Sequence, residues 1–109
     1  MDAKRGDLVV IVTSGDYGKP RPALVVQDDA FAALASLTLL PLSSDLQAAS
    51  MIRVDVPSGR ATGLRLPSQI MVDKPTTIPR AKVGQRIGRI DEATLAQVSR
   101  ALARFLGLA

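Results

Sequence analysis

The sequence of 109 residues contains no cysteine, no histidine and no tryptophan. Without cysteine the chain has neither disulfides nor thiolate chemistry, and without cysteine or histidine nearly every zinc-site design is excluded. Histidine is also the usual general acid or base, so any proton transfer must fall to carboxylates, Arg, Lys, Ser or Tyr. We therefore expect neither a structural metal nor a cofactor.

Aromatic residues and long apolar runs are also scarce. The aromatic side chains are only Tyr17, Phe31 and Phe105, which makes an extended platform for base stacking improbable. The chain has no run of eighteen apolar residues and no charged-then-apolar leader, so we expect a cytoplasmic protein with no membrane partner. With 47% hydrophobic content and no linker, residues 1–109 are expected to form a single domain.

Charge is distributed unevenly along the chain. Residues 1–52 hold four basic and six acidic side chains, whereas residues 53–109 hold ten basic and four acidic ones. Ten of the fourteen cations are arginines, whose planar guanidinium groups suit phosphate geometry. This pattern is consistent with a nucleic-acid partner, although genomic base composition also produces arginine-rich proteins.

The hydrophobic pattern predicts a mainly β protein. Short apolar or alternating segments bounded by Gly, Pro, Asp or Ser indicate strands over residues 7–13, 22–27, 37–41, 52–56, 64–72 and 83–90. Residues 28–34 fit a short helix, and 44–50 fit a polar loop. A longer helix is expected to begin at Asp91 and end at Gly107, with one apolar face made of Leu95, Val98, Leu102, Phe105 and Leu106.

A loop rich in glycine and proline precedes the second predicted strand. Pro20 and Pro22 fix their own φ angles and push Lys19 and Arg21 into extended conformations. An arginine held between two prolines at the start of a strand suits bidentate capture of a planar or tetrahedral anion, most often phosphate. The alternative is a surface turn with solvated charges.

These segments resemble the MazF/PemK/Kid toxin family. The resemblance is carried by Arg5-Gly6-Asp7 with the apolar run 8–12, and by K-P-R-P-A-L-V-V at 19–26. It continues in L-L-P-L-S-S at 39–44, V-D-K-P at 72–75 and R-I-G-R-I-D at 86–91. The matches span nearly the whole chain.

The resemblance implies a small SH3-like barrel with a carboxy-terminal α-helix. It also implies the toxin of a type II toxin–antitoxin system, a metal-independent and sequence-specific endoribonuclease that cleaves single-stranded RNA. Members of this family are homodimers that hold RNA in a groove between subunits, and a cognate acidic antitoxin covers the same groove. The positive charge of this chain makes an acidic partner physically reasonable.

The resemblance also assigns candidate catalytic residues. Arg21 matches the family's catalytic arginine, and Ser43 matches a hydroxyl that contacts the scissile phosphate, or else Ser43 caps a strand end. The general base is either Asp16, in the glycine loop, or Asp73, which matches the acidic residue of the Kid branch. That branch has an arginine two positions before its aspartate, where this chain has Met71.

Further residues are predicted to bind RNA: Lys19, Tyr17, Ser44, Lys74 and Arg53. Two other functions stay open. The related CcdB branch poisons DNA gyrase through a Trp-Gly-Ile ending, which the tail F-L-G-L-A at 105–109 only faintly echoes. A family member that binds RNA or antitoxin without cutting is the other possibility.

Overall fold

The computed structural model describes residues 3–12, 19–48 and 50–109. They form a mainly β fold with one long helix, as predicted. Two 3₁₀ turns, η1 (Asp29–Phe31) and η2 (Arg80–Lys82), interrupt the loops. The strands and helix are β1 (Asp7–Val12), β2 (Pro20–Val25), β3 (Ser36–Ser43), β4 (Arg53–Val56), β5 (Ser68–Met71), β6 (Thr76–Pro79), β7 (Arg86–Arg89) and α1 (Glu92–Phe105).

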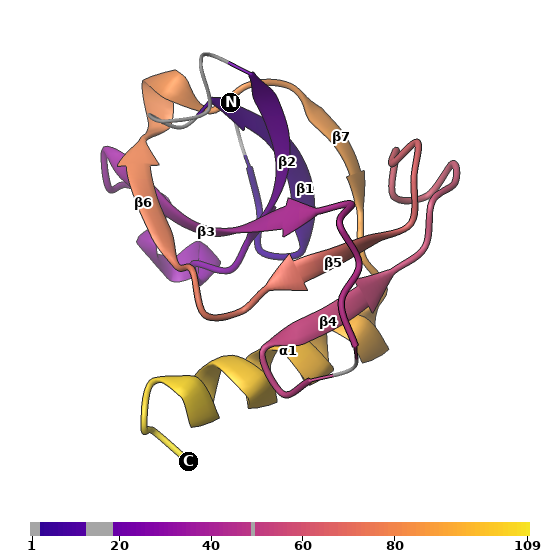
Figure 1. The fold of residues 1–109 in the computed structure, drawn as a ribbon. Coiled ribbons are helices and arrows are strands. Elements are labelled where there is room, and N and C mark those ends of the chain that lie inside the picture. The colour runs from indigo at the N-terminus through magenta and orange to yellow at the C-terminus, as the bar shows by residue number, and fades with distance from the viewer. Residues whose placement is uncertain (1–2, 13–18, 49) are drawn as a thin grey trace.

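The strands make a curled, half-barrel sheet in the order β4-β5-β3-β2-β1-β7, with β6 paired to the first half of β3 (Figure 1). The long strand β3 pairs with β6 over residues 36–39, with β2 over 39–41 and with β5 over 42–43. Ala23 of β2 lies opposite Pro41 of β3. This is the last paired position between the two strands, and Arg21 and Ser43 each lie two residues beyond it, toward the same end of the antiparallel pair.

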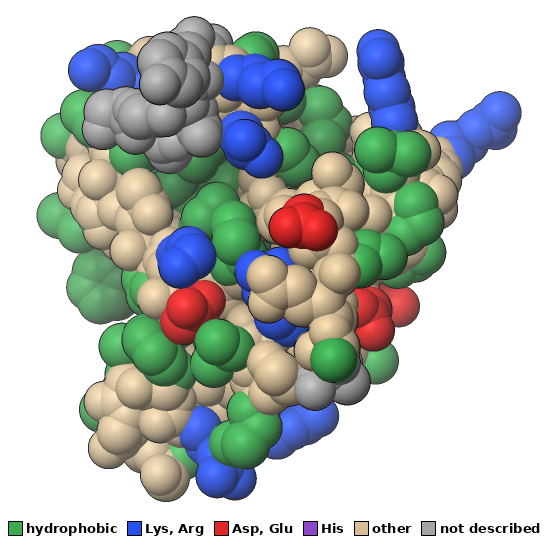
Figure 2. Space-filling view, viewed as in Figure 1, with side chains coloured by type: hydrophobic (Ala, Val, Ile, Leu, Met, Phe, Trp, Pro, Cys, Tyr) green, Lys and Arg blue, Asp and Glu red, His purple; other side chains and the backbone are tan. Residues whose placement is uncertain are grey.

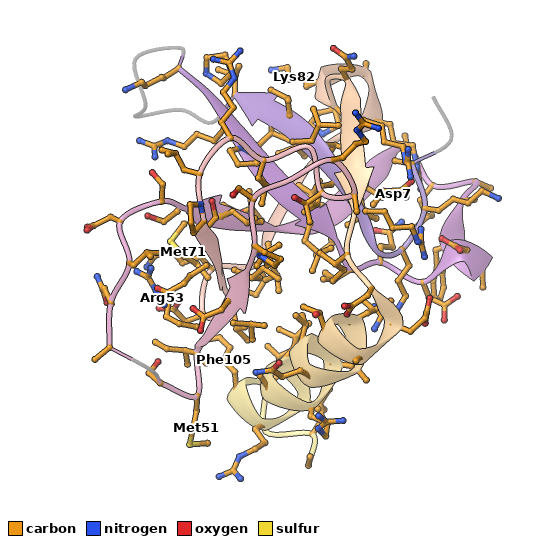
Figure 3. All side chains as sticks on the ribbon, turned by 90° about the vertical axis from the view of Figure 1, so that its right-hand side faces the viewer. Asp7, Met51, Arg53, Met71, Lys82 and Phe105 are labelled. Atoms are coloured by element: carbon orange, nitrogen blue, oxygen red, sulfur yellow. The ribbon has the colours of Figure 1, made fainter. Side chains whose placement is uncertain are left out.

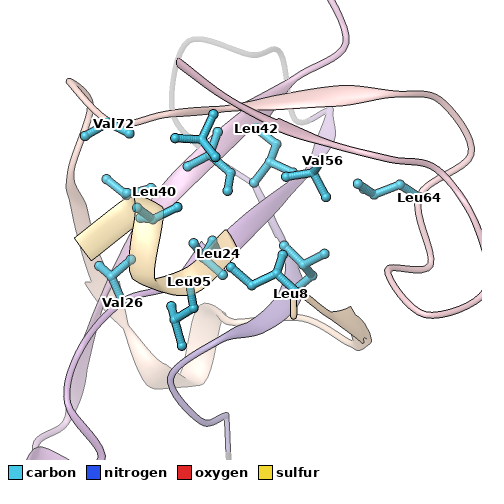
Figure 4. Close-up of a cluster of buried hydrophobic side chains, with 13 residues drawn as sticks. Leu8, Leu24, Val26, Leu40, Leu42, Val56, Leu64, Val72 and Leu95 are labelled. Carbon is cyan, nitrogen blue, oxygen red and sulfur yellow. The ribbon is translucent and has the colours of Figure 1, made fainter. Parts of the chain in front are cut away.

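The central strands are buried on both faces. Successive residues of β1 point to opposite sides of the sheet, so Leu8 packs toward α1 while Val9 and Ile11 pack on the other side. Figure 4 shows the first of these clusters, in which Leu95 of α1 meets Leu24 of β2 and their neighbours. Packing on both faces holds β1 and β2 in place, and with them the residues at the start of β2.

The helix α1 is anchored at its amino-terminal end. The carboxylate of Asp91 accepts a hydrogen bond from the backbone N–H of Thr94 at 2.7 Å, which confirms the predicted cap. The guanidinium of Arg5 donates to the carbonyl of Val26 and to the hydroxyl of Ser99. Arg5 therefore joins the start of the chain to both the sheet and the helix.

Three elements differ from the sequence prediction. The segment 76–79 forms β6, which was not predicted, and of the predicted strand 64–72 only 68–71 pairs. Pro67 has no N–H to donate to a strand ladder, so the residues before it form a loop. Phe105 and Leu106 were predicted on the buried face of α1 but are 46% and 52% exposed, because the last turn of the helix extends beyond β4 (Figure 1).

The aspartate of the Arg5-Gly6-Asp7 motif is buried in a cluster of cations. Its carboxylate accepts the backbone N–H of Lys4 at 2.9 Å and pairs with Arg86 at 3.1 Å and Arg89 at 2.9 Å. Burial by itself would raise the pKa of Asp7, but these hydrogen bonds and the Arg86 charge outweigh it and hold the pKa below its usual value. Asp7 therefore stabilises the fold in its ionised form.

We expect Asp7→Asn to lower the free energy of unfolding at neutral pH by about 2–3 kcal/mol, because it removes one partner of a buried charge network. In the wild-type protein, the contribution of ionised Asp7 to the free energy of unfolding should be fully present above about pH 4. It should be lost as the pH falls through the lowered pKa of Asp7. The variant should therefore show a weaker dependence of stability on acid pH. Urea denaturation between pH 2 and 7 measures this. Asp45→Asn is the control, since Asp45 is exposed and its carboxylate makes no hydrogen bond or ion pair with another described residue, and an equal loss there would contradict the assignment.

Candidate functional site

A groove of about 670 Å³ lies where β2 begins, between the β1–β2 pair and the loop that joins β4 to β5. Its apolar floor comes from all these elements and from β7, and it is formed by Val10, Pro22, Leu64 and Ile87. Its polar side chains are those of Lys19, Arg21, Ser44, Arg65 and Ser68. The described residues that line it include three cations and no carboxylate, so the groove has a positive potential that suits an anionic ligand.

Figure 2 shows Lys and Arg side chains along the upper part of this face, and two of them project over the loop between β4 and β5. Acidic side chains lie in the middle of the same face, and further Lys and Arg side chains lie among and below them. The groove itself is cationic through Lys19, Arg21 and Arg65, of which the first two belong to the amino-terminal half of the chain.

Arg21 is held as the sequence predicts. It lies opposite Ile11 in the β1–β2 ladder, half-buried, with Pro20 and Pro22 on either side. A strand position fixes the direction of its side chain far better than a loop would, and a fixed guanidinium can stabilise charge that develops on a bound phosphate.

Ser43 ends β3, and its hydroxyl oxygen accepts the backbone N–H of Asp45 at 3.0 Å. This hydrogen bond is the strand-end cap that the sequence offered as the alternative role. A hydroxyl that accepts one hydrogen bond can still donate its own proton, so the cap does not prevent Ser43 from contacting a phosphate. Its neighbour Ser44 lines the groove directly.

Asp73 and Lys74 do not line the groove. They lie in the turn after β5, where they form an ion pair at 3.5 Å. Gln69 of β5 is opposite Ser43, and Asp73 comes four residues later, at most about 13 Å farther along an extended chain. In the sheet β3 lies between β5 and β2; Asp73 follows the end of β5, whereas Arg21 lies at the start of β2 and lines the groove.

Arg53 lies on β4 directly opposite Met71, as the labels in Figure 3 show. Its guanidinium donates to the carbonyl of Asp45 and to the side-chain oxygen of Gln69, both at 3.4 Å. This chain therefore has an arginine beside position 71, but on the neighbouring strand and directed toward the loop after β3.

Asp16 and Tyr17 lie outside the described residues, in the segment 13–18. Lys19, which follows this segment directly, lines the groove. Among the residues that the structure does describe, no three acidic side chains come together in a way that could hold a metal ion. None of the helices in that part of the chain has the length and apolar character needed to span a bilayer.

Sequence reasoning missed two groove residues, Arg65 and Ser68. The sequence distinguishes Arg65 only as one of many basic residues, because 64–72 has the pattern of one strand. The signal in the sequence is the segment Gly63 to Pro67, in which a glycine and a proline flank a cation, much as two prolines flank Arg21. That spacing is typical of a structured loop.

Comparison with known proteins gives a consistent result. The family model for the PemK-like, MazF-like toxin of type II toxin–antitoxin systems matches residues 4–106. A protein from Mycolicibacterium smegmatis described as probable endoribonuclease MazF is 42% identical over 107 residues, which cover 97% of this chain and 98% of that protein.

Solved structures share the fold. The Mycobacterium tuberculosis toxin MazF-mt6 superposes with a TM-score of 0.80 at 21% identity, covering 94% of this chain and 98% of that one. The MazE–MazF complex of Deinococcus radiodurans gives a TM-score of 0.81 at 20% identity, covering 100% and 99%. A mycobacterial endoribonuclease solved with its cognate antitoxin gives a TM-score of 0.82 at 21% identity, covering 98% of this chain and 97% of that one. The chain therefore belongs to the PemK-like, MazF-like toxins of type II toxin–antitoxin systems.

Proposed function

We propose that this chain is a metal-independent, sequence-specific endoribonuclease that cleaves single-stranded RNA. The observation that carries the proposal is the cationic groove with Arg21 fixed at its edge. The family and a relative described as a probable endoribonuclease support this function over gyrase poisoning, which needs no catalytic groups. We place its action in the cytoplasm, where RNA substrates occur.

The proposed reaction is an intramolecular transfer within the RNA. A base removes the proton of a 2′-OH, the 2′-oxygen bonds to the adjacent phosphorus, and the bond to the 5′-oxygen breaks as that oxygen takes up a proton. The products are a 2′,3′-cyclic phosphate and a 5′-hydroxyl. Arg21 stabilises the charge that develops on the phosphoryl oxygens, and Ser43 donates a hydrogen bond to the same group.

The general base is assigned to Asp16 or Asp73. Two observations weigh against Asp73: it lies outside the groove, and it is paired with Lys74. Comparing Asp16→Asn with Asp73→Asn identifies the base, because only loss of the true base both slows cleavage and alters the pH profile. Lys19 and Ser44 line the groove and are proposed to bind RNA, together with Tyr17, Lys74 and Arg53.

We further propose a homodimer and an acidic antitoxin partner. The antitoxin is supported by the relatives solved with theirs, MazE in Deinococcus radiodurans and the cognate antitoxin of the mycobacterial enzyme. A two-fold dimer is the commonest assembly of soluble proteins. Light scattering should then give twice the chain mass of 11.5 kDa.

The dependence on the 2′-OH can be tested directly. We expect an RNA oligonucleotide that contains the cleavage sequence to be cut, and the same oligonucleotide with 2′-deoxyribose at the scissile position to remain intact, because it lacks the nucleophile. Gel analysis of both measures this, with deoxyribose one nucleotide away as the control. Cleavage of the oligonucleotide deoxygenated at the scissile position would overturn the mechanism.

A further inference from the structure

The loop between β4 and β5 is held firmly against β7. Gly63 has φ +72°, and a Cβ atom there would lie 2.0 Å from the carbonyl oxygen of Ile87. A Cβ atom on Gly88 would lie 2.5 Å from the oxygen of Ala61, whose carbonyl accepts the N–H of Arg89 at 2.9 Å. Glycine at both contacts allows the two backbones to touch, so the loop presents its side chains from a fixed position.

One cation of this loop faces the groove. Arg65 lines it together with Leu66, whereas Arg60, in the same loop, is exposed and does not. Neither guanidinium makes a hydrogen bond or an ion pair with another described residue. Arg65 is therefore available to a ligand in the groove, and Arg60 provides a matched cation outside it.

Arg65 and the β2 cations Lys19 and Arg21 flank the same apolar floor. A nucleotide has complementary features, with an anionic phosphate at its edges and apolar faces on its base. The groove volume of about 670 Å³ lies within the usual range of small-ligand sites, which suits unpaired nucleotides better than a duplex. The described lining residues include no aromatic side chain, so the floor contacts a base through aliphatic and proline surfaces.

We propose that the 63–66 loop forms a second RNA subsite, in which Arg65 binds a phosphate that neighbours the scissile phosphate held by Arg21. A base between the two phosphates lies on the apolar floor, within reach of the hydroxyls of Ser44 and Ser68. The inference rests on the proposed function and adds a residue that contacts substrate without taking part in bond breakage.

The test measures binding of an uncleavable RNA that carries 2′-deoxyribose at the scissile position. Arg65→Ala should weaken binding about 10-fold, and the slope of log K against log salt should become shallower by about 0.7, the value for one lost phosphate contact on a single strand. Arg60→Ala should change binding less than about twofold, because that side chain is outside the groove. Both side chains are exposed, so both variants should keep the wild-type melting temperature.

The phosphate itself can be located with single methylphosphonate substitutions, which remove one charge from the RNA at a time. A methylphosphonate at one position next to the scissile phosphate should weaken RNA binding by the wild-type protein about 10-fold. The same substitution should leave RNA binding by Arg65→Ala unchanged. Equal losses of RNA affinity in Arg65→Ala and Arg60→Ala would overturn the proposed subsite while leaving the nuclease assignment intact. So would the failure of every methylphosphonate position to distinguish the wild-type protein from Arg65→Ala. If the wild-type protein cleaves no RNA in a mixed pool, the proposed function fails and the subsite fails with it.

Discussion

Replacing Arg21 with alanine is expected to lower the rate of RNA cleavage by about 10² or more, the scale for removing one preorganised group that stabilises transition-state charge. The side chain is half-buried at the start of β2 and lines the groove, so its guanidinium has a fixed position relative to a bound phosphate. Arg21→Lys should recover little activity, because a point charge does not reproduce the planar fork. Single-turnover cleavage of a defined RNA measures both variants.

The matched control for net charge is Arg100→Ala, since Arg100 is exposed on α1 and does not line the groove. It should cleave within about twofold of the wild-type rate, and antitoxin binding should survive in the Arg21 variants. Toxicity that persists in Arg21→Ala and disappears when residues 107–109 are deleted would contradict the nuclease assignment. The essential surface would then be the tail, as in a gyrase poison.

Gly63→Ala is expected to lower the free energy of unfolding by roughly 3 kcal/mol or more. The variant combines the strain of a positive φ with a Cβ atom 2.0 Å from a backbone oxygen of β7, so the loop or the strand must move. Gly59→Ala separates these causes, because Gly59 also has a positive φ, of +140°, but nothing lies within 4 Å of its Cβ position. We expect a loss of about 1–2 kcal/mol there, from strain alone.

Chemical denaturation of the two variants measures the difference. Since the loop forms one wall of the groove, Gly63→Ala should also weaken RNA binding when the protein is still folded, whereas Gly59→Ala should not. Equal losses of stability in both variants would show that the close approach of the loop to β7 contributes little.

Local patterns in the sequence predict most of the fold. The apolar run of β1, the prolines at the start of β2, and the Asp91 cap with the spacing of Leu95 and Val98 are signals contained within a few residues, and the structure agrees with each. The loop before β5 is encoded only in part by local residues. Leu64 and Leu66 alternate as in a strand, Pro67 interrupts the ladder, and the contact of Gly63 with β7, which is distant in sequence, fixes the position of the loop.

The sequence predicts the orientation of a site residue when that orientation depends on neighbours in the same strand. It does not predict the relative positions of residues that lie on different strands. Arg21 is oriented by its own neighbours, so its placement followed from the residues around it. The separation of Asp73 from Arg21 and the position of Arg53 beside Met71 follow from the register of β5 against β3 and β4. Register is set by tertiary packing, which no single segment encodes.

The most direct test of the central claim is cleavage of a defined RNA pool by the purified protein in excess EDTA, with the chemistry of both new ends determined. The account predicts full cleavage, a 2′,3′-cyclic or 3′-phosphate on one fragment and a 5′-hydroxyl on the other, and no cleavage of DNA. Activity that requires added magnesium, or products that carry a 5′-phosphate, would contradict it.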